Sequence, residues 1–409
     1  HPLQYPGANA LALVAGADVK MVEHHMGMVM SIADHIVALN FGRKLAEGDV
    51  LTAGTDPGPH QQWPDRDARA AIDEINRAGG VLGGRPLKLV TTDNKGISAR
   101  GKDNFIELAG MKDMVAVFGG KYSPISVEVL PEAQRLKVPL ISVWGSADGI
   151  TDHKYRPSYT FRVSLKDEWG VEAMMRRMAS TYKASQACAF LPNTAWGRSA
   201  DAVIKSKAGQ YKLNFGVVRW YNWGDTSFQE HYRSCLNNQG QALMFVGNEK
   251  EAAVLLKEMA ALPASQRLPV VAHWGTVGGV LHEMVGEALS QVNFDVIQTF
   301  TFIQNSRPRA KALAQWIHTN SPYKTAQAIP SPVGAAHAYD TVHLLALAVE
   351  RARSTEGSRI RDALEKLPPF SGAVRDYKPA FTATRHDAFD SKQVLFVRVG
   401  LEGTLTPTP

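Results

Sequence analysis

The sequence predicts an α/β protein built of two doubly wound parallel-sheet lobes. From residue 50 onward, short apolar segments alternate with amphipathic helical segments, and strands separated by helices of this length form βαβ units around a parallel sheet. The alternation restarts after about residue 163. Because a single open sheet of about ten strands rarely persists, we expect two sheets of four or five parallel strands. Ligands normally bind at the carboxyl ends of such strands, which predicts a cleft between the lobes.

The first half of the chain supplies the elements of one lobe. A helix begins near Pro64, because proline suits a first helical turn, and ends at Gly79–Gly80, where a left-handed cap favours glycine. Further helices are expected at 98–108 and 126–136. The strands expected around these helices are 50–55, 86–93, 114–120 and 138–144.

The second half repeats the pattern and then becomes mainly helical. Its first four helices are expected at 167–182, 197–208, 227–237 and 249–261. The strands that alternate with them are expected at 186–191, 213–220, 242–247, 268–273 and 294–302. The chain then continues through helices at 307–319, 333–353 and 357–366 to a last strand at 392–399.

The composition is that of an ordinary globular protein. The 409 residues are 44% hydrophobic and 21% charged, which allows two domains and an attached segment. Because the basic residues alternate with acids and the formal charge is only +6, we expect solvated helix faces and no nucleic-acid surface. The sequence contains no run of about 18 apolar residues, so we expect no stable membrane insertion. No basic residues precede the short apolar patch LALVAGA, so no secretion signal is visible.

No motif for catalysis, cofactor binding or metal binding is visible. The sequence lacks G-x-S-x-G, H-E-x-x-H and Cys-x-x-Cys, and no G-x-G-x-x-G follows the first strand. The thirteen histidines form no convincing metal site, and His386–Asp387 are expected to shape a turn near the last strand. Cys188 lies in the apolar run QACAFL and is expected to be a buried thiol; an oxidising compartment would permit a bond to Cys235 without requiring it. We therefore expect that the protein is not an enzyme and that it binds neither a cofactor nor a metal.

The segment AAIDEINRAGGVLGGRPLKLVTTDN, residues 70–94, resembles the first helix and second strand of bilobed periplasmic solute-binding proteins of the branched-chain amino-acid receptor type. Later segments resemble that family's landmarks in the family's order. They are VFGGKYSPISVEVLPEAQRLKVPLIS, FRVSLKDEWG at a hinge crossing, LPNTAWGRS, WYNWGDTSF, HAYDTVHLLALAVERA and RHDAFDSKQVLFVRV. The resemblance covers about residues 50–400.

The resemblance implies the type I periplasmic binding protein fold, with two lobes joined by a hinge. The first lobe would comprise residues 50–163 with a return at 298–378. The second lobe would comprise residues 164–297, with 379–409 as its closing segment and tail. Such proteins close on a small ligand by hinge motion and present the closed form to a membrane permease. The resemblance thus implies a monomeric, periplasmic receptor of an ABC uptake system that binds an amino acid or a related carboxylate.

Five candidate ligand-binding residues lie on expected cleft loops of the first lobe. They are Tyr122, Ser123, Trp144, Gly145 and Ser146. The resemblance implies that the positions of Ser123 and the Gly145–Ser146 turn hold a ligand carboxylate through hydroxyl and backbone donors. The alternative is that both serines only cap the helices that follow them. Lys121 could attract an anion or remain a solvated charge.

The second lobe contributes four further candidates, which are Trp196, Asn248, Glu249 and Trp274. Trp196 matches an aromatic position that packs on the ligand in similar receptors, whereas Asn248 and Glu249 could instead cap a helix. Trp274 departs from the family pattern, because amino-acid receptors tend to place there an acid that pairs with the α-ammonium group. Three tryptophans, including Trp144, would suit an aromatic or other organic carboxylate, which is the alternative ligand class.

Residues 19–49 resemble the C-terminal part of the ATPase subunit of a branched-chain amino-acid transporter, with a strand, a helix and a strand. Glu23–His24 would match the switch-histidine motif, but His25 stands where an aspartate is usual. No G-x-x-x-x-G-K-[ST] loop exists to hold phosphates, so residues 1–49 are expected to be a non-catalytic remnant. ATP hydrolysis is thus the least supported function, behind a ligand-sensing regulator with the same bilobed fold.

Overall fold

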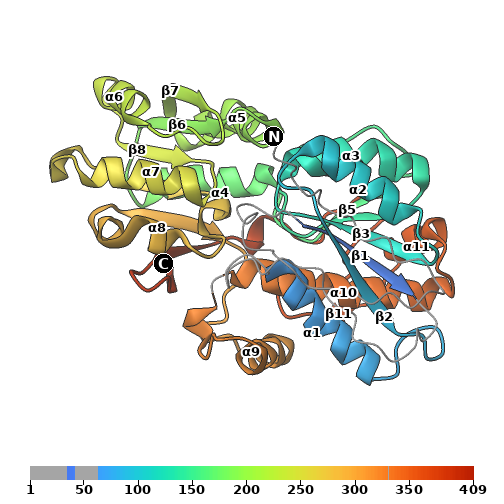
Figure 1. Cartoon of the computed structure of the whole chain (residues 1–409). Coiled ribbons are helices and arrows are strands. Elements are labelled where there is room, and N and C mark those ends of the chain that lie inside the picture. Colours follow the sequence, from blue (N-terminus) through green and yellow to red (C-terminus); the bar gives the residue numbers. More distant parts are fainter. Residues whose placement is uncertain (1–34, 42–62, 330) are drawn as a thin grey trace, which may run out of the picture.

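Two α/β lobes lie side by side in the computed structural model, which describes residues 35–41, 63–329 and 331–409 (Figure 1). The first lobe contains a five-stranded sheet in the order β2-β1-β3-β4-β5. Its strands are β1 (His35–Phe41), β2 (Leu87–Asp93), β3 (Met114–Gly119), β4 (Leu140–Ser142) and β5 (Thr160–Arg162). Its helices are α1 (Trp63–Arg77), α2 (Ser98–Ala109), α3 (Ser123–Leu136), α10 (Pro332–Ala352) and α11 (Gly357–Leu364).

The second lobe contains a seven-stranded sheet in the order β14-β13-β10-β9-β8-β6-β7. Its strands are β6 (Gln186–Pro192), β7 (Asn214–Tyr221), β8 (Ala242–Phe245), β9 (Val270–Ala272), β10 (Phe294–Gln298), β13 (Leu395–Val399) and β14 (Leu405–Thr408). Its helices are α4 (Asp167–Ser180), α5 (Ala195–Lys207), α6 (Gln229–Asn237), α7 (Glu249–Ala260) and α8 (Leu281–Val285). Helix α9 (Pro308–Asn320) and the hairpin of β11 (Phe370–Ser371) and β12 (Asp376–Tyr377) belong to the chain's return to the first lobe.

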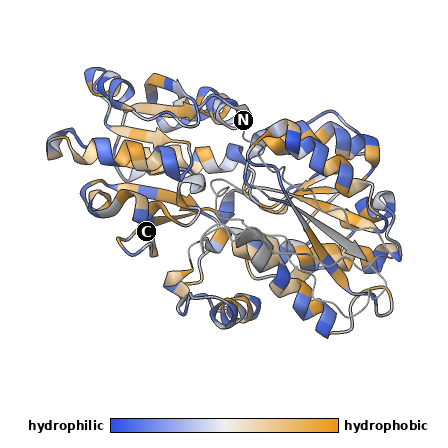
Figure 2. Ribbon diagram, viewed as in Figure 1, coloured by the Kyte–Doolittle hydropathy of each residue, from blue (hydrophilic) through white to orange (hydrophobic). Residues whose placement is uncertain are grey.

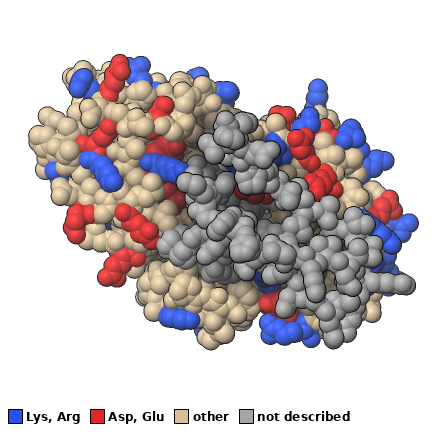
Figure 3. Space-filling model, viewed as in Figure 1, with Lys and Arg blue, Asp and Glu red and all other residues tan. Residues whose placement is uncertain are grey.

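Helices cover both faces of each sheet, which is why the central strands are continuous apolar runs. Every residue of β3 and of β8 is buried, and Figure 2 shows hydrophobic strands beneath helices whose outer faces are hydrophilic. Helix α1 packs along α10 and ends where the sequence predicts, because Gly79 and Gly80 adopt φ values of +107° and +72°. The visible surface carries interspersed acidic and basic side chains on both lobes (Figure 3).

The predicted fold class is confirmed, but the sheets are not wholly parallel. Strands β13 and β14 extend the second sheet to seven strands, and each pairs antiparallel with its neighbour. Strand β1 lies antiparallel between β2 and β3 in the first sheet. Residues 35–41 thus form a strand of the receptor lobe itself, whereas the expected strand at 50–55 and the motif at Glu23–His24 lie outside the described residues.

Several element boundaries differ from the predictions for local reasons. Helix α3 begins at Ser123, three residues before the expected start at 126, because Pro124 suits the first helical turn. Strand β10 ends at Gln298, where the chain leaves the second sheet, and not at the predicted residue 302. The hairpin β11–β12, whose strands have two residues each, and strand β14 were not predicted.

Cys188 and Cys235 form a disulfide that joins strand β6 to helix α6. The expectation of a free thiol at Cys188 is therefore wrong, although the residue is fully buried as expected. The sequence could not reveal the pairing, because 47 positions separate the two cysteines and only the βα packing brings their Cα atoms to 5.9 Å.

His337 in α10 joins the second crossing between the lobes to the end of β4. Its Nδ1 donates to the Val143 carbonyl oxygen at 2.9 Å, and the Thr299 hydroxyl donates to its Nε2 at 2.7 Å. Burial lowers the pKa of His337 to about 3, so the ring is neutral at physiological pH. The carbonyl oxygen can only accept, so Nδ1 carries the ring proton. Nε2 of the neutral ring then has no proton and must accept from the Thr299 hydroxyl.

We expect His337 to make the protein progressively less stable in acid. The pKa of the folded state lies below that of the unfolded chain, so stability is present above about pH 6.5 and is lost towards about pH 3, by about 1.4 kcal/mol per pH unit. Denaturant unfolding at several pH values should therefore show a smaller pH slope for His337→Asn than for the unmodified protein. Thr299→Val, which leaves the titrating ring in place, should retain the slope. Equal slopes for the unmodified protein and His337→Asn would contradict this assignment.

Candidate functional site

The loops that follow the strands of the two sheets meet between the lobes. Among the described residues, several pairs join these loops, each with one member from the first lobe and one from the second. They include Lys121 Nζ and Glu249 Oε2 at 3.5 Å, the rings of Tyr122 and Trp223 at 4.8 Å, and the Asp148 N–H donating to Ser199 Oγ at 2.9 Å. The carboxyl ends of the strands therefore face one another, as doubly wound sheets require for a shared ligand site.

Ser123 and the turn after β4 form a compact group of hydrogen-bond donors. Ser123 Oγ accepts from the backbone N–H groups of Ser146 at 3.1 Å and Ala147 at 3.2 Å. Ser123 is thus not a helix cap for its own α3. Because Ser123 Oγ accepts both N–H groups, the Ser123 hydroxyl is the donor left for an anionic oxygen, and a ligand carboxylate would reach the two N–H groups by taking the place of Ser123 Oγ.

Hydrogen bonds from the far side hold this turn in position. Arg162 Nη1 donates to the carbonyl oxygens of Ser146 and Ala147, both at 2.8 Å. The hydroxyls of Ser142 and Ser164 donate to the Gly145 carbonyl at 3.1 and 3.0 Å. With its carbonyls occupied behind, the turn presents its N–H groups on the Ser123 side. The structure therefore brings Ser123, Gly145 and Ser146 together.

Trp144 lies apart from the other two candidate tryptophans. A Cβ added to Gly334 at the start of α10 would lie 2.9 Å from Cζ3 of Trp144. The indole thus packs closely on the backbone of the same lobe, where only glycine fits. No ring contact joins it to Trp196 or Trp274 within the described residues. The grouping of three tryptophans around one ligand therefore stays a prediction, with ring contacts through His273 joining Trp196 and Trp274.

Trp196 and Trp274 lie on either side of His273 at the carboxyl end of β9. The His273 ring is 4.8 Å from that of Trp196 and 4.0 Å from that of Trp274. Asn248 joins the group, because a Cβ at Gly275 would lie 2.7 Å from Trp196 and 3.3 Å from Asn248 Oδ1. Asn248 makes no capping bond to α7 through its side chain. Trp274 is 1% exposed.

Glu249 is already engaged by other groups. Its Oε1 accepts from the Val280 N–H at 2.8 Å, and its Oε2 lies 3.5 Å from Lys121 Nζ. Lys121 is therefore more than a solvated charge, because it forms an ion pair with Glu249 between the lobes. Because the Lys121 side chain is 28% exposed, this pair contributes at most about 1 kcal/mol to closure.

The sequence interpretation missed two buried residues at the centre of this group, Asp167 and His273. The Asp167 N–H donates to the Ser146 carbonyl at 2.9 Å, and Asp167 Oδ1 lies 3.3 Å from His273 Nε2. Both residues are fully buried. Among the described residues, the Asp167 oxygens, both His273 nitrogens and Trp196 Nε1 have no hydrogen-bond partner. The only sequence signal was an acid directly after a hinge crossing.

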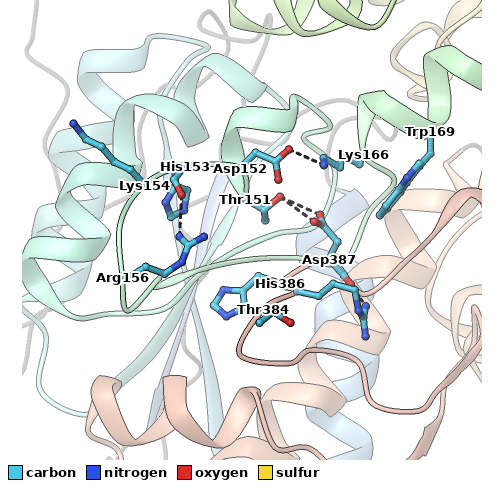
Figure 4. A pocket seen from close by; sticks show the side chains of 11 residues that line it. Thr151, Asp152, His153, Lys154, Arg156, Lys166, Trp169, Thr384, His386 and Asp387 are labelled. Atoms are coloured by element: carbon cyan, nitrogen blue, oxygen red, sulfur yellow. Dashed lines mark hydrogen bonds and ion pairs between the residues drawn. The ribbon is translucent and has the colours of Figure 1, made fainter. Parts of the chain in front are cut away.

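A polar pocket of about 670 Å³ lies behind the turn, at the hinge (Figure 4). It is lined by Thr151, Asp152, His153, Lys154, Arg156, Lys166, Trp169, Thr384, Arg385, His386 and Asp387. Several of these side chains pair with one another: Thr151 Oγ1 donates to the Asp387 carboxylate at 3.1 Å, and Lys166 Nζ lies 2.6 Å from Asp152. His386 and Asp387, expected to shape a turn, follow the turn at 382–385 and also bond Thr160 and Arg162 at the hinge.

The hinge joins two interlobe crossings by backbone hydrogen bonds. The Arg162 N–H donates to the His386 carbonyl at 2.9 Å, and the Ala388 N–H donates to the Arg162 carbonyl at 2.9 Å. Arg162 Nε also lies 2.6 Å from Asp387 Oδ1. The crossing near Arg162 and the crossing near His386 are therefore paired with each other. Together they run directly behind the turn at Ser146.

Neither a metal cluster nor a membrane-spanning helix is found in the described ranges. No group of three or more His, Cys, Asp or Glu residues among them could hold a metal ion. None of the helices in 63–329 or 331–409 is long and apolar enough to cross a bilayer.

Comparisons with known proteins give a family and a fold. No curated protein matches the chain. The branched-chain amino-acid substrate-binding protein LivJ of Streptococcus pneumoniae, solved with isoleucine, shares 21% identity at a TM-score of 0.69, over 86% of this chain and 95% of that one. A Bordetella pertussis type 1 periplasmic binding protein shares 18% identity at a TM-score of 0.75, over 87% and 97%. A Rhodopseudomonas palustris solute-binding protein of an ABC transporter, solved with benzoate, shares 16% at 0.70, over 87% and 92%.

These three structures are less than 25% identical to the chain, so they show its fold. The periplasmic binding protein family model matches residues 66–401, which is most of the sequence. Residues 19–49 lie outside this match. The chain belongs to the periplasmic binding protein family.

Proposed function

We propose that the protein is an extracytoplasmic substrate-binding receptor of an ABC uptake system and binds one small carboxylate between its lobes, without turnover. The observation that carries this proposal is the convergence of Ser123 Oγ with the N–H groups of Ser146 and Ala147, at 3.1 and 3.2 Å, beside the second lobe. The Ser123 hydroxyl suits a ligand carboxylate, and the two N–H groups would join it where a ligand oxygen takes the place of Ser123 Oγ. The partners are this ligand and the permease subunits, and the receptor acts as a monomer.

The ligand belongs to one of two classes, an amino acid or an aromatic or other organic carboxylate. Relatives of both kinds share the fold, since one was solved with isoleucine and another with benzoate. The site comprises the nine candidates proposed from the sequence, which are Tyr122, Ser123, Trp144, Gly145, Ser146, Trp196, Asn248, Glu249 and Trp274. Trp196 and Trp274 supply the apolar surface that either class needs.

We further propose that the domains divide at the crossings, with 50–163 and 298–378 in the first lobe, to whose sheet strand β1 also belongs, and 164–297 and 379–409 in the second. Residues 1–49 are proposed to have no catalytic role, and strand β1 within them serves the receptor sheet. The disulfide between Cys188 and Cys235 supports a periplasmic location, because such bonds persist in oxidising compartments. A ligand-sensing regulator is the second candidate, and isolation of a soluble signalling partner in place of a permease would favour it.

Thermal unfolding with added ligands tests the proposal. A ligand that binds only the folded state stabilises it by RT ln(1 + [L]/Kd), so about 4 kcal/mol is expected at roughly a thousandfold excess over Kd. Amino acids and aromatic acids should be compared at millimolar concentration, with ATP as the control for the ATPase alternative. We expect a shift with at least one carboxylate and none with ATP. An unchanged Tm with every carboxylate would remove the ligand proposal.

A further inference from the structure

The polar pocket at the hinge (the hinge pocket) is lined by more positive than negative charge (Figure 4). Its charged side chains are four basic and two acidic ones, namely Lys154, Arg156, Lys166, Arg385, Asp152 and Asp387. Their ion-pair partners outside the lining, Arg162 and Glu168, carry opposite charges and cancel each other. Four positive and two negative charges therefore leave an excess of two positive charges around a space of about 670 Å³.

Both acids of the lining already have a cation as partner. Asp387 Oδ1 lies 2.6 Å from Arg162 Nε, and the same carboxylate accepts from the Thr151 hydroxyl at 3.1 Å. Asp152 Oδ2 lies 2.6 Å from Lys166 Nζ. The excess positive charge therefore belongs to the three remaining basic side chains of the lining.

Arg156 and Arg385 bond carbonyl oxygens and no acid within the described residues. Arg156 Nη1 donates to two carbonyls of its own loop, at 2.8 and 2.6 Å. Arg385 donates through Nη2 to the Pro379 carbonyl at 2.9 Å and through Nη1 to the Asp387 carbonyl. The Lys154 amine points away from the other side chains in Figure 4. Because a carbonyl does not neutralise a guanidinium and because each guanidinium has five N–H donors, both arginines can still bind an anion.

The pKa values of groups beside the hinge pocket indicate the same imbalance. Burial and repulsion by Arg156 lower the pKa of His153 below its ordinary value. Burial also lowers the pKa of Arg385, and the attraction of Asp387 does not reverse this effect. Since a desolvated cation is stabilised by an anion placed against it, the hinge pocket favours an anionic occupant.

The size of the hinge pocket and the spacing of its cations favour an organic anion with several charged groups. Figure 4 shows Arg156 on one side of the pocket and Lys166 with Trp169 on the other. The volume of about 670 Å³ lies within the range of roughly 300–1,000 Å³ for small-molecule sites. Carboxylates that are spaced along a carbon skeleton can reach separate guanidinium groups, each through two parallel N–H bonds.

We propose that the hinge pocket is a second binding site, distinct from the interlobe site, and that it takes a small polycarboxylate such as citrate. Arg156 and Arg385 bind its carboxylates, and Trp169 packs against its carbon skeleton. The two sites are separated by Arg162, which bonds the carbonyls of the turn on one side and Asp387 of the hinge pocket on the other. The proposal does not depend on the receptor function.

A purely structural role of the two arginines is the competing explanation. In that case Arg156 and Arg385 serve only to hold their loops through the carbonyl oxygens. This explanation requires that the unmodified protein binds no polyanion at the hinge pocket. Direct titration therefore separates the two explanations.

The test is isothermal titration of the full chain with citrate, with inorganic phosphate and acetate compared at an ionic strength kept constant by sodium chloride. We expect one saturable citrate site per chain and weaker binding of phosphate and acetate. Arg156→Gln and Arg385→Gln should each weaken citrate binding at least about 10-fold, since each removes a charge-assisted hydrogen-bond partner. Arg100→Gln makes the same charge change at an exposed position of α2 outside the hinge pocket, and it should bind citrate as the unmodified protein does.

Tryptophan fluorescence locates the bound citrate. Citrate should change the emission of the unmodified protein, and Trp169→Phe should abolish this change while titration still detects binding. Arg156 is exposed, so Arg156→Gln should fold and keeps the test valid even if Arg385→Gln does not.

Each contrary result overturns a stated part of the proposal. Absence of saturable citrate binding by the unmodified protein overturns it and supports the structural role of the arginines. Citrate bound at the interlobe site would bind Arg156→Gln unchanged, and its fluorescence change would survive Trp169→Phe, which also overturns it. Tighter binding of phosphate than of citrate overturns the polycarboxylate assignment. None of these results bears on the receptor function, which amino acids and aromatic acids test at the other site.

Discussion

Removal of the disulfide between Cys188 and Cys235 is expected to lower the free energy of unfolding by about 4 kcal/mol. The bond closes a loop with a sequence separation of 47 residues, and the loop-closure entropy that it removes from the unfolded chain corresponds to about 4 kcal/mol at 25 °C. Alanine is the appropriate replacement at both positions, because both side chains are fully buried and a serine hydroxyl would have to find a new partner.

Urea unfolding with and without a reducing agent provides the measurement. The unmodified protein should unfold at lower urea concentration when reduced, and the double variant Cys188→Ala/Cys235→Ala should behave like the reduced protein. The reducing agent should have no effect on the double variant, which controls for other actions of the reagent. If reduction does not change the urea concentration at which the unmodified protein unfolds, the bond contributes nothing to stability.

The order of elements could be predicted from the sequence because each carries its own signal. Strand β3 is a buried apolar run, and helix α1 ends at two glycines with positive φ values. The direction of β1 could not be predicted, because side-chain alternation is the same for a parallel and an antiparallel strand. The start of α3 at Ser123 does carry a signal in the sequence, because Pro124 suits a first helical turn.

The candidate site was predictable only where a motif marks it. Ser123, Gly145 and Ser146 come together as the resemblance implies, since each follows a strand whose end faces the other lobe. Asp167 gave no such signal, because an acid at the first position of a helix is usual and reads as a partner of the helix dipole. Its burial beside His273 depends on two elements more than a hundred residues apart in the sequence. Tertiary packing therefore decides its role.

Arg162→Met is expected to lower the free energy of unfolding by about 3–5 kcal/mol, because it leaves the buried Asp387 carboxylate without its cation. Arg162 is fully buried and bonds Asp387 at 2.6 Å, Thr151 at 2.5 Å and the carbonyls of Ser146 and Ala147 at 2.8 Å. Denaturant unfolding should show that the double variant Arg162→Met/Asp387→Asn is more stable than Arg162→Met alone, since it buries no unpaired charge. Equal stabilities for the two variants would contradict the charge argument.

The same pair of variants separates the two roles of Arg162. If Arg162 only neutralises Asp387, the double variant should bind ligand as tightly as the unmodified protein once it is fully folded. If Arg162 also holds the turn by the carbonyls of Ser146 and Ala147, the double variant should still bind more weakly, because the opposing N–H groups are no longer fixed. We expect the second result, measured by titration calorimetry at a temperature where both proteins are folded. Asp387→Asn, which keeps the guanidinium on both carbonyls, should lose stability but retain affinity. That result would couple the hinge to the ligand site, because one guanidinium bonds both Asp387 and the carbonyls of the turn.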